Sequence, residues 1–148
     1  MQPIPKGLIL SVLILAACGK SGHQGHIEEV KTTDNPNQAL YDQVMDVHNE
    51  VMPKSDQLYQ LKKELQNKVA QTPALSEEKK KQLRQLIAAL DSADRSMMDW
   101  MHKFKPLPDT ANQELAREYL ENEMEKIKKV RDLINDTLLK ANEEAAKK

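Results

Sequence analysis

Residues 44–65, VMDVHNEVMPKSDQLYQLKKEL, decide the fold because their apolar side chains recur every seven positions. One series consists of Val44, Val51, Leu58 and Leu65, and a second consists of Leu40, Val47 and Leu61. This spacing places both series on one side of a helix. The stripe keeps its phase across Pro53, so we expect one kinked helix over residues 37–70 rather than two separate helices.

The residues that follow predict two further helices of similar length. All four glycines of the chain precede residue 26, so the body lacks the residues that tight strand turns usually require. Its breaks are prolines, first Pro73 and then Pro106 and Pro108. We therefore expect helices over residues 76–104 and 110–145.

Caps and apolar spacing refine this expectation. Ser76 is a suitable N-cap for the second helix, and Asp109 or Thr110 for the third. The second helix is expected to bury Leu83, Leu86 or Ile87, Leu90, Met97, Met101 and Phe104. The third is expected to bury Leu115, Tyr119 or Leu120, Met124, Ile127, Val130, Ile134 and Leu138. Short turns between long helices predict an all-α, antiparallel up-down-up three-helix bundle over residues 37–148. An extended coiled coil that dimerises or trimerises is the alternative.

The beginning of the chain has the three parts of a secretory signal. Lys6 provides a positive charge, residues 8–15 are apolar, and two alanines precede Cys18. An apolar run that ends in small residues and a cysteine is typical of bacterial lipoproteins, so we expect residues 1–17 to be removed and Cys18 to carry palmitate and other acyl chains. The polar, glycine-rich residues 18–36 would form a flexible tether. An ordinary signal peptide and an N-terminal apolar helix, each with an incidental cysteine, are the alternatives.

Composition narrows the function further. The chain carries 22 basic and 23 acidic residues, a net charge of -1, which gives no electrostatic case for nucleic-acid binding. No nucleophile, base and orienting group stand at a recognisable spacing, so we expect a protein that is not an enzyme. Its single cysteine excludes an intrachain disulfide.

One constellation of side chains suggests chemistry. Met45, His48 and Met52 share a face of the first helix, and Met98, Met101 and His102 share a face of the second. Antiparallel pairing would bring residue 48 beside residue 98, with Trp100 on the flank. Thioether and imidazole ligands suit Cu(I) or Ag(I). The alternatives are that these methionines fill the core or line a groove for a partner.

Asp94 falls on the expected buried stripe between Leu90 and Met97. Burial of an unpaired carboxylate is costly, so two interpretations stay open. Asp94 is either a buried acid near the level of the methionines or an edge residue paired with Arg or Lys.

Two segments carry a resemblance to known sequences: residues 45–54, MDVHNEVMPK, and residues 97–104, MMDWMHKF. On these segments the chain resembles small predicted bacterial lipoproteins that are commonly labelled "viral A-type inclusion protein". The resemblance covers most of the mature chain and implies helical, coiled-coil-like sequence, without implying an activity or site residues.

Together these observations predict a lipid-anchored helical bundle of a bacterial cell envelope, with its body in the periplasm. Gly19 after the cysteine, in place of an aspartate, favours the outer membrane over the inner membrane. We expect a binding or structural role with an envelope protein as partner or through self-association, and no cofactor unless the Met/His cluster binds Cu(I).

Overall fold

The computed structural model describes residues 35–108 and 110–147 of the 148-residue chain. The predicted signal peptide, the lipidation site at Cys18 and nearly all of the predicted tether lie outside the described residues. Residues 33–148 form one compact unit with its own hydrophobic core.

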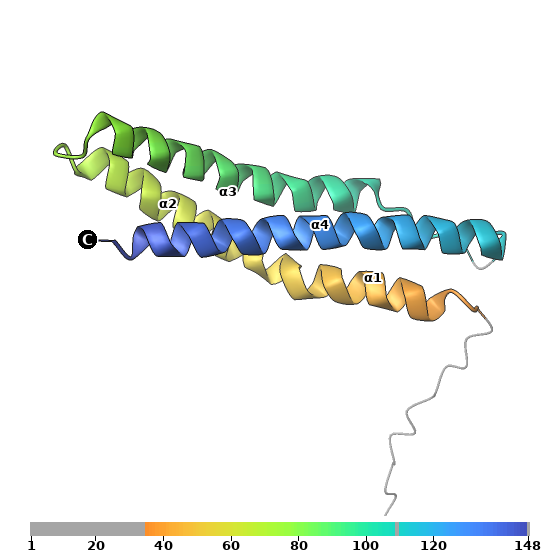
Figure 1. Ribbon diagram of the computed structural model, residues 1–148. Coiled ribbons are helices and arrows are strands. Elements are labelled where there is room, and N and C mark those ends of the chain that lie inside the picture. Colours follow the sequence, from red (N-terminus) through yellow and green to blue (C-terminus); the bar gives the residue numbers. More distant parts are fainter. Residues whose placement is uncertain (1–34, 109, 148) are drawn as a thin grey trace, which may run out of the picture. The chain divides into compact units, whose positions relative to one another are not determined.

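The described residues form four α-helices and one short 3-10 helix. In chain order they are α1 (Gln38–Val51), η1 (Met52–Lys54), α2 (Ser55–Gln71), α3 (Glu77–Lys103) and α4 (Gln113–Ala145). The predicted kink at Pro53 is the single 3-10 turn η1, which joins α1 and α2 into one bent rod (Figure 1). Proline has no backbone N–H and its ring disturbs the preceding turn, so a tighter turn is a natural solution at this position.

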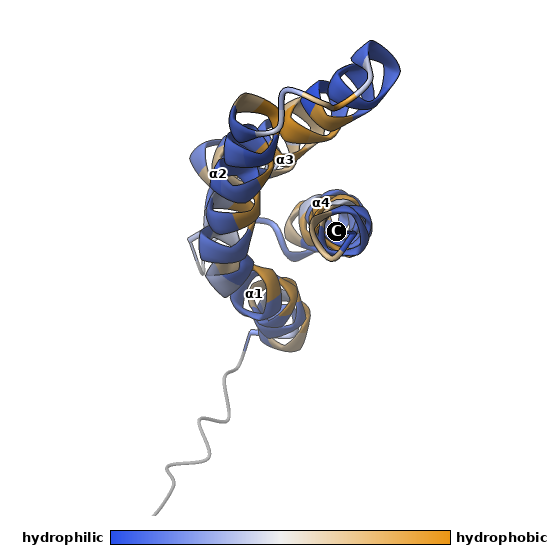
Figure 2. Ribbon diagram, turned by 90° about the vertical axis from the view of Figure 1, so that its left-hand side faces the viewer, coloured by the Kyte–Doolittle hydropathy of each residue, from blue (hydrophilic) through white to orange (hydrophobic). Residues whose placement is uncertain are grey.

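The helices pack as the predicted antiparallel three-helix bundle. α3 runs antiparallel to α2 and packs along it. α4 reverses direction once more and packs against α1, α2 and α3. Viewed nearly along α4, the other helices form an arc around one of its sides, with their apolar surfaces turned toward it (Figure 2). All described helices thus share one intramolecular core, and the bundle does not need a second chain to complete it.

The predicted stripe of α1 and α2 forms one wall of this core. Val44, Val51 and Leu65 are fully buried, and Leu58 is almost so. From α4 the stripe meets Ile127 and Ile134, which are also fully buried. Burial of each such side chain stabilises the fold by about 1.5–3 kcal/mol.

Hydrogen bonds at the helix starts explain where α3 and α4 begin. The Ser76 hydroxyl accepts a hydrogen bond from the Lys79 N–H at 3.2 Å, which confirms the predicted N-cap of α3. The predicted cap of α4 at Asp109 or Thr110 is wrong. Asn112 caps this helix instead, and its Oδ1 accepts hydrogen bonds from the backbone N–H groups of Glu114 and Leu115. Just before this cap, the Ala111 N–H donates a hydrogen bond to the Pro108 carbonyl.

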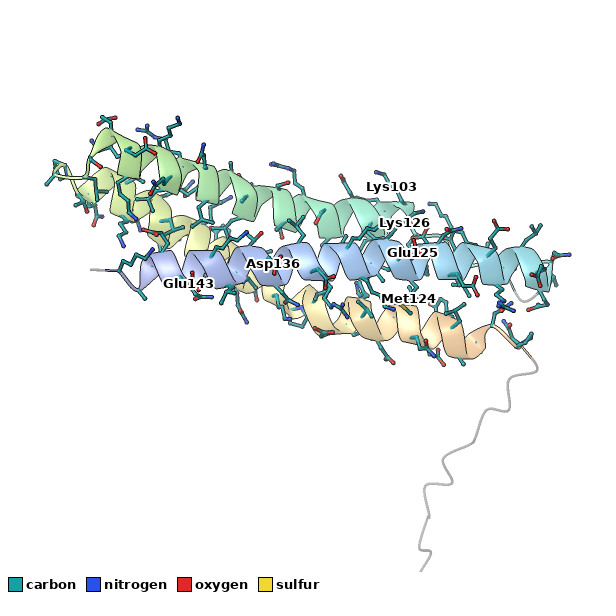
Figure 3. All side chains as sticks on the ribbon, in the orientation of Figure 1. Lys103, Met124, Glu125, Lys126, Asp136 and Glu143 are labelled. Atoms are coloured by element: carbon teal, nitrogen blue, oxygen red, sulfur yellow. The ribbon has the colours of Figure 1, made fainter. Side chains whose placement is uncertain are left out.

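The apolar face predicted for α4 is correct except at its first turn. Leu115 is 65% exposed, whereas the neighbouring Ala116 is buried. Farther along, Met124 lies on the side of α4 that faces α1, and Lys126 on the side that faces α3 (Figure 3).

Candidate functional site

The side chains predicted to meet between the first two helices do approach one another. The His48 ring of α1 lies against the Trp100 ring of α3, with ring centroids 5.7 Å apart. This contact confirms that residues near 48 and 98 share one level of the bundle. Trp100 was predicted on the flank, but it is only 6% exposed and belongs to the core.

Trp100 belongs to an aromatic cluster that joins three helices and has Phe104 at its centre. Its ring stacks on Phe104 at 4.9 Å between centroids. Phe104 in turn lies 6.1 Å from Tyr41 of α1 and 6.1 Å from Tyr119 of α4. α1 and α3 diverge toward this end of the bundle (Figure 1), and the ring contacts join the two helices there. We call these residues and His48 the aromatic cluster.

Hydrogen bonding around the aromatic cluster is incomplete. The Trp100 Nε1–H is buried and has no hydrogen-bond partner among the described residues. His48 is half-buried, and its Nδ1 lies 3.0 Å from the Asn49 Oδ1 on the same helix. Its ring is therefore held by a neighbouring amide and by the face of an indole.

The structure divides the predicted metal ligands into two groups. Met52 and Met101 are partly buried and pack against the core, and Met45 is half-buried like His48. Met98 is 39% exposed and His102 is also exposed, because both lie on the outer side of α3. Within residues 35–108 and 110–147, no three His, Cys, Asp or Glu side chains are grouped to hold a metal ion.

Asp94 is half-buried at the seam between α2 and α3. It lines a small cavity of about 30 Å³ together with Leu58, Tyr59, Lys62, Leu90 and Asp91. The Lys62 ammonium donates a hydrogen bond of 2.7 Å to Asp91, and this bond holds the pKa of the Asp91 carboxyl below its ordinary value. The cross-helix ion pair of this seam is therefore made by Asp91.

The acidic side chain that the described structure does bury is Glu123 of α4, which is 4% exposed. Its carboxylate accepts a hydrogen bond of 2.7 Å from Lys126, whose side chain reaches solvent. Burial of the Glu123 carboxylate costs less free energy than burial of an unpaired one, because the ammonium group of Lys126 offsets its charge. Sequence reasoning missed Glu123, since α4 carries many similar Glu/Lys spacings.

A larger cavity of about 140 Å³ lies where α1 begins and α4 begins. The buried side chain of Asn37 closes one wall, and its Nδ2 donates hydrogen bonds of 2.9 Å to the backbone carbonyl and to the side-chain Oε1 of Gln113. Tyr41 and the Pro106–Pro108 segment supply further walls. Sequence reasoning missed this cavity because Asn37 stands among turn-forming residues that carry no apolar pattern.

Ion pairs link the helices at the opposite end of the bundle. Lys79 of α3 forms an ion pair with Glu144 of α4, and Lys147 donates a second hydrogen bond to the same carboxylate. These two ammonium groups, with Lys79 the stronger influence, lower the pKa of Glu144. Lys68 of α2 donates to the Glu144 backbone carbonyl at 2.9 Å, which satisfies a free carbonyl at the end of α4.

Comparisons with known proteins add no family to this description. No family model, no curated protein and no solved structure matches the chain. Among the residues that the structure describes, no helix is long and apolar enough to cross a membrane.

Proposed function

We propose that this protein is a lipid-anchored bundle of a bacterial cell envelope that binds or braces another envelope component. The apolar run that closes on Ala16, Ala17 and Cys18 carries this proposal, because it combines a secretory signal with an acyl attachment site. The separate core of residues 33–148 supports it, since the body can fold independently of the anchoring segment. The role is one of binding rather than catalysis.

The lipid anchor is tested by expressing the full chain in a bacterium and determining the mass of its N-terminal peptide. We expect the chain to begin at Cys18 with acyl chains attached, and to sediment with membranes. A Cys18→Ala chain should keep its leader and its bundle but lose the acyl mass. Recovery of wild-type protein with an unmodified residue 18 would refute the anchor.

A second candidate function is the binding of Cu(I), with Ag(I) as its substitute. The contact between His48 and Trp100 favours it, because it brings the donors of α1 beside an indole face that can contact a cation. The placement of the side chains reduces the predicted ligand set to those that are partly buried, namely Met45, His48, Met52 and Met101. Soft sulfur and imidazole donors suit this ion.

Titration with Cu(I) against a competing chelator tests this candidate. Trp100 is the single tryptophan of the chain, so its fluorescence reports directly on the proposed site. We expect quenching on binding, its loss in a Met45→Leu, His48→Ala, Met101→Leu chain, and no change in a Met98→Leu, His102→Ala control. Equal affinity in the two variants would eliminate the copper site without affecting the lipid anchor.

A further inference from the structure

Charge is distributed unevenly along the bundle. The half with α1 and the α3–α4 connection (residues 35–57, 97–108 and 110–133) has 11 acidic and 8 basic residues, a net charge of -3. We call it the acidic half. The other half (residues 58–96 and 134–147) has 8 acidic and 10 basic residues, a net charge of +2, and is called the basic half. A helical body with opposite charge at its two ends favours antiparallel association with a second such body.

One face of the bundle spans both halves. It consists of two series with seven-residue spacing: Met45, Met52 and Tyr59 on α1 to α2, and Arg84, Asp91 and Met98 on α3. The ion pair between Lys62 and Asp91 joins the two series across the seam. We call this surface the seam face. Its middle lies over the seam between α2 and α3, and Figure 2 shows no other helix among the described residues on the side of these two helices away from α4.

The seam face combines exposed apolar side chains with the two charge signs. Tyr59 is 53% exposed in the basic half, and Met98 is 39% exposed in the acidic half. Lys62 and Lys63 hold their ammonium groups 5.9 and 5.6 Å from the centre of the Tyr59 ring. Beside Tyr59 lie Lys62, Asp91 and Asp94, whose charges largely offset one another. Farther from the centre of the seam face, the basic half carries Lys63, Lys80 and Arg84, and the acidic half carries Asp42, Asp46 and Glu50.

We propose that the seam face binds a second copy of this chain in antiparallel orientation. A two-fold axis makes the same patch serve both partners, so the patch must complement itself. Rotation about an axis near the middle of the seam face sets the acidic half of each copy on the basic half of the other. The same rotation carries Met98 toward Tyr59 of the second copy, a favourable pairing of sulfur and ring. A parallel pair would place like charges together.

The dimer is tested by sedimentation equilibrium of residues 33–148 at low and high salt, so the result does not depend on the lipid anchor. We expect a dimer at low salt whose dissociation constant rises about tenfold or more in ~0.5 M salt, because screening weakens exposed ion pairs. A Lys63→Glu, Arg84→Glu chain should be monomeric. A Lys129→Glu, Lys140→Glu control makes the same charge change on exposed positions of α4 and should still dimerise.

Complementary charge reversal distinguishes the antiparallel dimer from a change in folding. An Asp42→Lys, Asp46→Lys chain should also be monomeric alone, since both contacts then join basic surfaces. A mixture of this chain with the Lys63→Glu, Arg84→Glu chain should form a one-to-one heterodimer, because both contacts then join opposite charges. A monomeric wild-type body at low salt, or two variants that stay monomeric when mixed, would overturn the proposal.

Discussion

Replacement of Trp100 tests how the aromatic cluster stabilises the bundle. The side chain is only 6% exposed, so it removes roughly 200–250 Å² from water, an upper bound of about 5–6 kcal/mol at ~25 cal/mol per Å². Large-to-small changes in cores cost about 3–5 kcal/mol. We therefore expect Trp100→Ala to lower the free energy of unfolding by about 4 kcal/mol.

The comparison with Trp100→Phe is the informative one. The Nε1–H has no hydrogen-bond partner among the described residues, so its removal should carry no hydrogen-bond penalty. Phenylalanine also keeps a ring against His48 and Phe104. The cost should therefore be about 1–2 kcal/mol, from lost volume alone.

Urea unfolding followed by far-ultraviolet circular dichroism measures both variants without relying on the deleted indole. With a slope of about 2 kcal/mol per M, the alanine chain should shift its midpoint by roughly 2 M and the phenylalanine chain by less than about 1 M. If the phenylalanine chain were as unstable as the alanine chain, the indole N–H would have an important partner and this account of the cluster would be wrong.

Three further predictions concern the helix ends and the core. Asn112→Ala should lower stability by about 1 kcal/mol in thermal unfolding, since Oδ1 caps two amides of α4, whereas an equal loss in Thr110→Ala would contradict this cap. Glu144→Gln should be less stable than wild type at pH 7. The pKa of Glu144 is lower in the folded state than in the unfolded state, where it is about 4.3. The ionised carboxylate therefore stabilises the fold above that pH, and this stabilisation is lost as the pH falls through the folded-state pKa, so wild type and variant should become equally stable in acid. A stability difference that does not depend on pH would exclude the ion pair as its cause. Leu65→Ala should lower the free energy of unfolding in urea by about 2–5 kcal/mol. Leu139→Ala, at a 61% exposed position, should change it by less than ~0.5 kcal/mol. Similar losses in the two variants would mean that the core is misassigned.

The helices were predictable because their signals are local. A seven-residue apolar repeat needs only neighbouring turns, and it identified Val44, Val51 and Leu65 as core residues correctly. The cap at Ser76 was equally local. The cap of α4 was not, because Asn112, Thr110 and Asp109 are all suitable cap residues and the turn between Pro108 and Ala111 selects among them.

The candidate site was predictable at the level of helix register but not of side-chain direction. Antiparallel pairing of the first two predicted helices placed residue 48 near residue 98, and the contact between His48 and Trp100 confirms this placement. Which side of α3 faces inward at that level depends on how α1, on the N-terminal side of the turn at Pro53, diverges from α3. That divergence requires a large side chain to fill the space, so Trp100 points inward while Met98 and His102 remain outside.

By itself the sequence determined the helical class and the number and direction of the long helices, because these follow from spacing and composition within single segments. Tertiary packing decided which titratable side chain is buried, which methionines remain exposed and where the cavity at Asn37 forms. Those outcomes depend on the angles between helices, and the angles arise from contacts among all of them at once.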